Sequence, residues 1–176
     1  MKKYVTYLFF LTIIFGCDKI DELTQFNVDY TSTVTIPSSS VINLPIDIYT
    51  PEIESNSEST FSVNDTRKDL VEEVKLEEFN LTLISPETGD LSFLQTIEIY
   101  INADDLSEIK IAWKENIPDD VGTLLELETT DSDLKEYIKK DSFQLRVKTI
   151  TDEMINQDHE IEVYANFFVD AKILGV

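Results

Sequence analysis

The chain is poor in the residues that build cross-linked or reactive sites. It has one cysteine, Cys17, and one histidine, His159, among its 176 residues. A single cysteine excludes a disulfide within the chain, and a single histidine excludes a metal site with several histidine ligands. His159 ends the polar stretch 151–159, so we expect a solvated turn residue rather than a catalytic base. The four glycines include no phosphate-binding loop, and stability must come from an apolar core.

Positive charge is also scarce. The chain has 14 lysines and arginines against 35 aspartates and glutamates, which gives a formal net charge of −21. A surface this acidic repels nucleic acids and anionic lipid headgroups. We therefore expect no nucleic-acid partner, and we interpret most of the acidic residues as a solvated surface.

The first seventeen residues differ from the rest of the chain. Two lysines precede an uncharged apolar run, residues 4–15, which ends at Gly16 and Cys17. A basic start followed by about 7 to 15 apolar residues is typical of a secretory signal. A transmembrane helix needs about 20 apolar residues, so this run is too short to span a bilayer comfortably. The segment therefore predicts export.

The end of this segment, Ile14-Phe15-Gly16-Cys17, resembles the lipobox of bacterial lipoproteins. The resemblance implies that residues 1–16 are a signal peptide, cut between Gly16 and Cys17, and that Cys17 is acylated. Two or three acyl chains would hold the protein stably on a membrane. Residues 17–23 would then be a lipidated tether to a single domain, 24–176. The alternatives are an uncleaved anchor or an ordinary signal peptide, which would leave Cys17 as an unpaired thiol.

Most of the remaining chain alternates apolar with polar residues, the period of two that is typical of half-buried β-strands. The runs lie at 26–36, 42–48, 74–83, 97–101, 109–113, 143–147 and 161–173. Turn-forming residues separate them, and no strand–helix repeat argues for a parallel sheet. We therefore predict an all-β fold, an antiparallel β-sandwich of immunoglobulin-like or Greek-key type, with one or two short connecting helices.

Three strand features refine this prediction. Pro45 predicts an edge strand, because proline donates no ladder hydrogen bond. The three-residue step from Leu76 to Phe79 predicts a β-bulge that keeps both side chains on one face. The runs 97–101 and 109–113 predict a hairpin with Trp113 pointing inward.

The helix predictions concern two connecting segments. Thr130 to Asp133 resembles a capping box, and the spacing that follows predicts a short helix over 134–138. Residues 52–66 are predicted to be a loop with Phe61 and Val63 as its core anchors. Asn64 or Asp65 is expected to cap a helical turn after that loop.

Calcium is the only cofactor that the sequence suggests, and no specific motif supports it. Asp104, Asp105, Asp119 and Asp120 lie in predicted turns, and a shared calcium site requires these turns to lie at one end of a sandwich. Carboxylates and loop carbonyls are the ligands that calcium prefers. The alternative is that the four aspartates form turns and add solubility, because no EF-hand pattern is present.

Aromatic residues on the polar faces of strands are candidate ligand-binding residues. Tyr100, Tyr164 and Phe168 have this placement, and exposed rings are suited to binding sugars. The alternative is that helices or loops cover them. Adjacent carboxylates such as Glu77-Glu78 could serve as acid and base in a glycoside hydrolase, although such pairs arise readily among 35 acidic residues.

These observations predict a lipid-anchored cell-envelope protein with a non-catalytic binding or structural role. The chain resembles small envelope lipoproteins of Bacteroidota-type bacteria, which favours the outer membrane over the inner one. Its expected partners are the membrane, through Cys17, and another envelope protein or a glycan. The alternatives are a carbohydrate-binding accessory lipoprotein and, after it, an envelope glycoside hydrolase.

Overall fold

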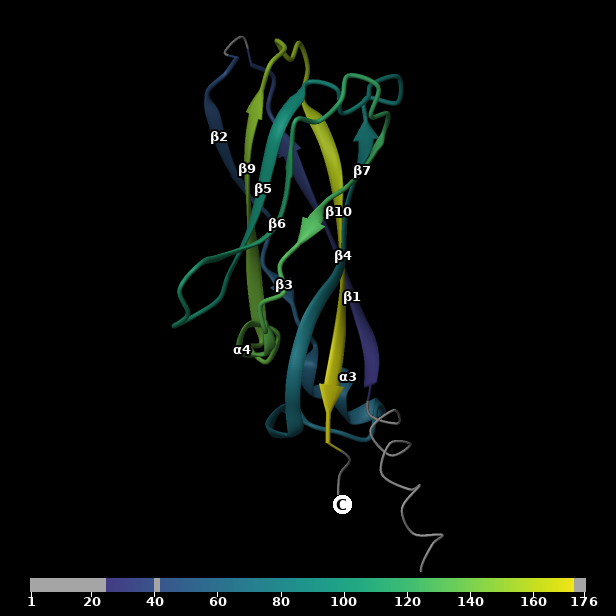
Figure 1. Cartoon of the computed structure of the whole chain (residues 1–176), viewed down its shortest axis with the longest axis vertical. Helices are drawn as coiled ribbons and strands as arrows, with labels where there is room; N and C mark the ends of the chain where they lie inside the picture. Colours follow the sequence, from purple (N-terminus) through teal and green to yellow (C-terminus); the bar gives the residue numbers. More distant parts are fainter. Residues whose placement is uncertain (1–24, 40–41, 173–176) are drawn as a thin grey trace, which may run out of the picture.

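A computed structural model describes residues 25–39 and 42–172 of the chain (Figure 1). Two antiparallel sheets pack face to face, so the predicted β-sandwich is confirmed. The predicted signal peptide and tether, including Gly16 and Cys17, lie outside the described residues, as does Ile173 at the end of the last predicted strand.

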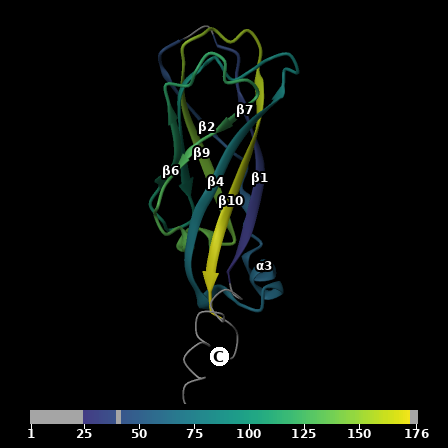
Figure 2. The same cartoon turned by 45° about the vertical axis from the view of Figure 1, so that its right-hand side comes forward.

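One sheet has four strands and the other has six. The four-stranded sheet has the order β1 (Gln25–Ile36), β10 (His159–Ala171), β4 (Val71–Ser85), β7 (Leu124–Glu126). The six-stranded sheet has the order β2 (Pro45–Tyr49), β9 (Ser142–Thr151), β5 (Leu94–Asn102), β6 (Ile109–Glu115), β8 (Glu128–Thr129), with β3 (Ile53–Glu54) also paired to β9. Figure 2 shows β1, β10 and β4 side by side along the length of the molecule.

The core lies between the two sheets. Buried and half-buried positions alternate along β10 and β9, which is the pattern expected of strands with one face on a core. Phe167 is fully buried, and its ring packs in T-shaped arrangements with those of Tyr30 and Phe143, at centroid distances of 5.8 and 6.4 Å. The buried apolar residues of the described ranges form one cluster.

The predicted bulge in β4 is confirmed. Asn166 of β10 pairs with Glu78, but the next residue, Phe167, pairs with Leu76. Glu77 is therefore an extra residue in β4. Glu77 and Glu78 both point outward as a result, while Leu76 and Phe79 both stay in the core.

A second bulge makes the prediction for Trp113 wrong. Ile99 pairs with Ala112 and Tyr100 with Lys110, so Ile111 is the extra residue in β6. Beyond this bulge the side chains exchange faces. Trp113 lies opposite Glu98 on the outer face of the six-stranded sheet, and its indole N–H donates to Glu128 Oε2 at 3.1 Å.

The edge position of β2 is confirmed, and its predicted apolar face is confirmed only for Ile46 and Ile48, which are half-buried, with Ile48 packed against the core. The strand begins only at Pro45, and the preceding Ile42 and Leu44 are exposed.

His159 differs from the prediction of a solvated turn residue. It begins β10, is buried, and packs against Phe93 with ring centroids 4.5 Å apart.

The helix predicted over 134–138 is confirmed as α4 (Lys135–Ile138). Asp133 accepts hydrogen bonds from the backbone N–H groups of Lys135 and Val74, so it ties the start of this helix to β4. Tyr137 and Ile138 of this helix are buried.

The prediction of a loop over 52–66 is wrong, because α3 spans Ser57–Val63. Phe61 anchors this helix in the core, with its ring 6.1 Å from that of Phe26, whereas Val63 is 80% exposed. Asn64 ends α3 instead of starting the next turn, and the 3-10 helix η2 (Lys68–Leu70) has no side-chain cap. Tertiary packing of one aromatic residue outweighs the weak helix propensity of this serine-rich segment.

Candidate functional site

The outer face of the four-stranded sheet contains a pocket of about 500 Å³. Side chains from all four strands line it: Asn27 of β1, Asn166 of β10, Glu77, Glu78 and Asn80 of β4, and Glu126 of β7. We call these six residues the amide pocket. Its volume lies within the range of small-molecule binding sites, about 300 to 1,000 Å³.

The strand register brings these residues together. Asn80 pairs with Tyr164 of β10 on one side and with Glu126 of β7 on the other. Asn166 pairs with Glu78. The bulge adds Glu77 to the same outward face, within reach of β1. Neighbouring strands are about 4.8 Å apart, so side chains in register on one face lie side by side.

Hydrogen bonds within the amide pocket hold its side chains in place. The Asn27 amide donates to Asn166 Oδ1 at 2.8 Å and to Glu77 Oε2 at 3.0 Å. The Asn80 amide donates to Glu78 Oε1 at 2.5 Å. The Asn80 Oδ1 atom is buried and accepts no hydrogen bond within the described ranges.

Two of the three predicted aromatic residues flank this pocket. Tyr164 and Phe168 lie on either side of Asn166 at outward positions of β10, and both are half-buried. The Asn166 amide lies 3.5 Å from the Tyr164 hydroxyl. Two rings thus border a set of polar groups, a combination that suits ligands with both apolar and hydroxyl-bearing faces.

Tyr100, the third predicted aromatic residue, lies on the outer face of the other sheet. The Arg146 guanidinium stacks 4.0 Å from the centre of the Tyr100 ring. The Tyr100 hydroxyl donates to Glu98 at 3.0 Å. Arg146 is held in turn by ion pairs with Asp47 and with Glu108. One face of the Tyr100 ring is therefore occupied, and the structure does not bring Tyr100 together with Tyr164 and Phe168.

Glu98 is the centre of the charged network beside Tyr100. Lys148 and Lys110 each pair with its carboxylate, at 3.0 and 3.1 Å. Its pKa is lowered from 4.5 to about 2, chiefly by the hydrogen bond from Lys148. The folded state therefore favours the ionised carboxylate more strongly than the unfolded state does.

Replacing Glu98 with glutamine should destabilise the protein by about 1 kcal/mol at neutral pH. Because the folded pKa is lowered, this contribution is complete above pH 4.5 and is lost as the pH falls towards about 2. Thermal melts from pH 7 to pH 2 should show the difference between native and variant proteins shrinking over that range. Glu115→Gln, an exposed position on β6, is the control; an equal loss in both variants would contradict the role of Glu98.

The four aspartates proposed for calcium do not share a site. Asp104 and Asp105 follow β5, whereas Asp119 and Asp120 follow β6, the next strand and antiparallel to it. The two pairs are therefore at opposite ends of the sandwich, and the predicted shared site is wrong. In the described ranges no group of three or more histidine, cysteine or acidic residues has an arrangement that could hold a metal ion.

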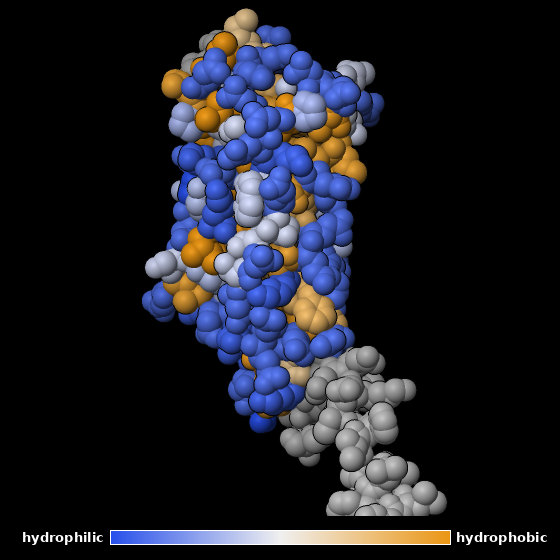
Figure 3. Space-filling view, in the orientation of Figure 1, coloured by the Kyte–Doolittle hydropathy of each residue, from blue (hydrophilic) through white to orange (hydrophobic). Residues whose placement is uncertain are grey.

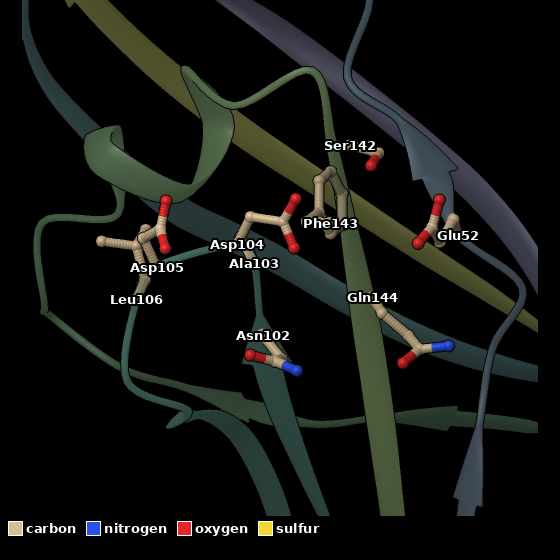
Figure 4. A pocket seen from close by; sticks show the side chains of 9 residues that line it. All are labelled: Glu52, Asn102, Ala103, Asp104, Asp105, Leu106, Ser142, Phe143 and Gln144. Atoms are coloured by element: carbon tan, nitrogen blue, oxygen red, sulfur yellow. The ribbon is translucent and has the colours of Figure 1, made fainter.

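Asp104 and Asp105 instead line a smaller pocket of about 290 Å³ at the end of the six-stranded sheet (Figure 4). Glu52 borders it on the side away from the two aspartates, and Asn102 and Gln144 also line it. The Gln144 amide is already used, since it donates to the Thr50 carbonyl at 2.8 Å. Phe143 also lines this acidic pocket, which lacks the amide network of the amide pocket.

Sequence reasoning named the rings beside the amide pocket but missed its amides. Asn27, Asn80 and Asn166 occupy ordinary polar positions of alternating strands, which look like solvent-facing residues. The one local signal was the pair Glu77-Glu78 at the predicted bulge.

The surface in Figure 3 is largely hydrophilic, in keeping with the net charge. None of the helices in the described ranges has the length and apolar character needed to cross a membrane.

Comparisons with known proteins give no family. No protein-family model matches the chain, and no curated protein matches it. A solved structure described as Desmodium yellow mottle tymovirus is 7% identical with a TM-score of 0.28, over 86% of this chain and 85% of that chain. Another, on the promiscuous specificity of carbohydrate-binding modules from the β-sandwich superfamily, is 13% identical with a TM-score of 0.27, over 91% of this chain and 60% of that chain. Similarities this low carry no conclusion about function.

Proposed function

We propose that this protein is a lipid-anchored, non-catalytic binding protein of the cell envelope that binds a glycan in the amide pocket. The observation that carries the proposal is the pocket itself, in which amides and carboxylates from four strands gather on one face. Tyr164 and Phe168 lie next to it in register, paired with Asn80 and Asn27. Sugars present hydroxyl groups at their edges and C–H groups on their faces. Amide and carboxylate oxygens accept from the former, and aromatic rings pack against the latter.

The sheet also supports binding because it keeps the site rigid. All six residues of the amide pocket belong to strands, and Asn27 is held by two hydrogen bonds. Binding to a preorganised site costs little conformational entropy. The pocket lies on the outer face of a sheet and is open to solvent, which leaves room for a chain of sugars to extend beyond it.

Titration of residues 18–176 with a panel of soluble oligosaccharides tests the proposal. Asn166→Ala should weaken binding by about tenfold or more, because it removes one amide and frees Asn27. Thr33→Ala, on the outer face of β1 but outside the pocket, should bind like the native protein. Equal binding by both variants, or no binding across the panel, would contradict the proposal.

The alternative is a glycoside hydrolase that uses Glu77 and Glu78, since both line the same pocket. The same panel distinguishes it, because a hydrolase shortens the oligosaccharides. Turnover that disappears in Glu78→Gln would replace the binding proposal with this one.

The proposed lipid anchor is tested on the native protein rather than on the recombinant domain. Intact mass should show loss of residues 1–16 and addition of acyl chains at Cys17, and the protein should partition with membranes. A Cys17→Ser form should lose both properties. An unmodified native cysteine would leave the binding proposal standing without its anchor.

A further inference from the structure

We infer that the glycan bound by the amide pocket carries protonated amines, as an oligomer of glucosamine does, rather than being neutral or acidic. The inference rests on the proposed function. It follows from which hydrogen-bonding groups of the pocket remain free and from the charge around them.

Three of the six amide N–H donors of the pocket are used by its own acceptors, and the Asn166 amide lies 3.5 Å from the Tyr164 hydroxyl. The Asn27 amide donates to Asn166 and to Glu77, and the Asn80 amide donates to Glu78. The acceptors outnumber them, since each ionised carboxylate offers about four lone-pair sites. Glu126 has no hydrogen bond or ion pair within the described ranges. A matching ligand must therefore be rich in donors.

The pocket also carries negative charge. The hydroxyl groups of a neutral sugar would supply hydrogen-bond donors but no positive charge to balance it. Three carboxylates line the pocket, those of Glu77, Glu78 and Glu126. Lys75 is the only lysine or arginine in β1, β4, β7 and β10. Its ammonium group is occupied by Glu73 at 3.0 Å and by the Asp131 carbonyl at 2.5 Å.

The pocket therefore has an uncompensated negative charge on a protein whose net charge is already −21. Such a field repels uronic acids and sulfated sugars and attracts cations. An ammonium group donates three hydrogen bonds and accepts none, which complements free carboxylate oxygens. The flanking Tyr164 and Phe168 rings favour an amine carried on a sugar over a simple polyamine, because a sugar also offers a C–H face.

Isothermal titration with three hexasaccharides tests the inference. The hexamers are glucosamine, its N-acetylated counterpart and galacturonic acid, compared at low salt and at a pH where the amines are protonated. The glucosamine hexamer should bind at least about tenfold more tightly than the acetylated one, and the acidic hexamer should be the weakest. The preference should decrease with added salt and when the pH exceeds the pKa of the amine.

Variants connect the preference to the pocket. Glu78→Gln and Glu126→Gln should each reduce the preference for the glucosamine hexamer over the acetylated hexamer by about tenfold. Glu162→Gln, on the same face of β10 but outside the pocket, is the matched control for charge. Hexalysine is the control for attraction to the acidic surface in general.

The outcomes separate the inference from the proposed function. If the acetylated or acidic hexamer binds better, and Asn166→Ala abolishes that binding, the protein binds glycans but the inference about the amine is wrong. If hexalysine binds as tightly as the glucosamine hexamer and Tyr164→Ala has no effect, the attraction is unspecific and the inference is also wrong. If no sugar binds, the proposed function itself fails.

Discussion

Deleting Lys75 should destabilise the sandwich by about 3 kcal/mol or more, whereas deleting Glu77, two residues later, should leave it folded. Both deletions remove an outward-pointing residue of β4. Without Lys75, Val74 and Leu76 become neighbours, and neighbours in a strand point to opposite faces. One of two buried side chains must then leave the core, or Glu77 must enter it.

Deletion of Glu77 has the opposite consequence because it removes the bulge. Leu76, Glu78 and Phe79 then alternate regularly, and the pairs Leu76–Phe167 and Glu78–Asn166 become consecutive. Urea denaturation should show a cooperative transition close to that of the native protein. Sugar binding should nevertheless be lost, since Asn27 loses a partner and the pocket loses a carboxylate. Equal stability of the two deletion variants would show that the register around the bulge is wrong.

Phe167→Ala should destabilise the protein by about 3 to 5 kcal/mol, the range for removing a fully buried aromatic ring. The ring lies at the centre of the core on β10 and meets both Tyr30 and Phe143, so its removal leaves a cavity that neither sheet can close. A loss of this size is a large part of the stability of a domain, about 5 to 15 kcal/mol.

The adjacent residue provides the control for this substitution. Phe168 has the same side chain but faces outward beside the amide pocket. Phe168→Ala should change the free energy of unfolding by less than about 1 kcal/mol and should instead weaken sugar binding. Chemical denaturation and titration of the two variants therefore separate the core face of β10 from its binding face. A large loss of stability in Phe168→Ala would indicate that Phe168 packs under another element.

Local patterns in the sequence determined much of the fold. The period of two in apolar residues predicted the strands. The step between Leu76 and Phe79 predicted the bulge, and Pro45 predicted the edge strand. These predictions succeeded because each depends on residues within one strand. The same reasoning failed for Trp113. Ile111 and Ala112 are both apolar and both buried, so a bulge at Ile111 leaves no interruption in the alternation of residues 109–113.

The sequence by itself therefore determined the class of the fold, the positions of most strands and which residues within a strand share a face. Only the tertiary structure decided which faces meet and in what register. Asn27 and Asn166 are 139 residues apart and come within 2.8 Å only because β1 pairs with β10, whereas Asp105 and Asp119 are close in sequence and lie at opposite ends of the sandwich. A period of two specifies a direction within one strand, but contacts between strands depend on the packing of the whole core.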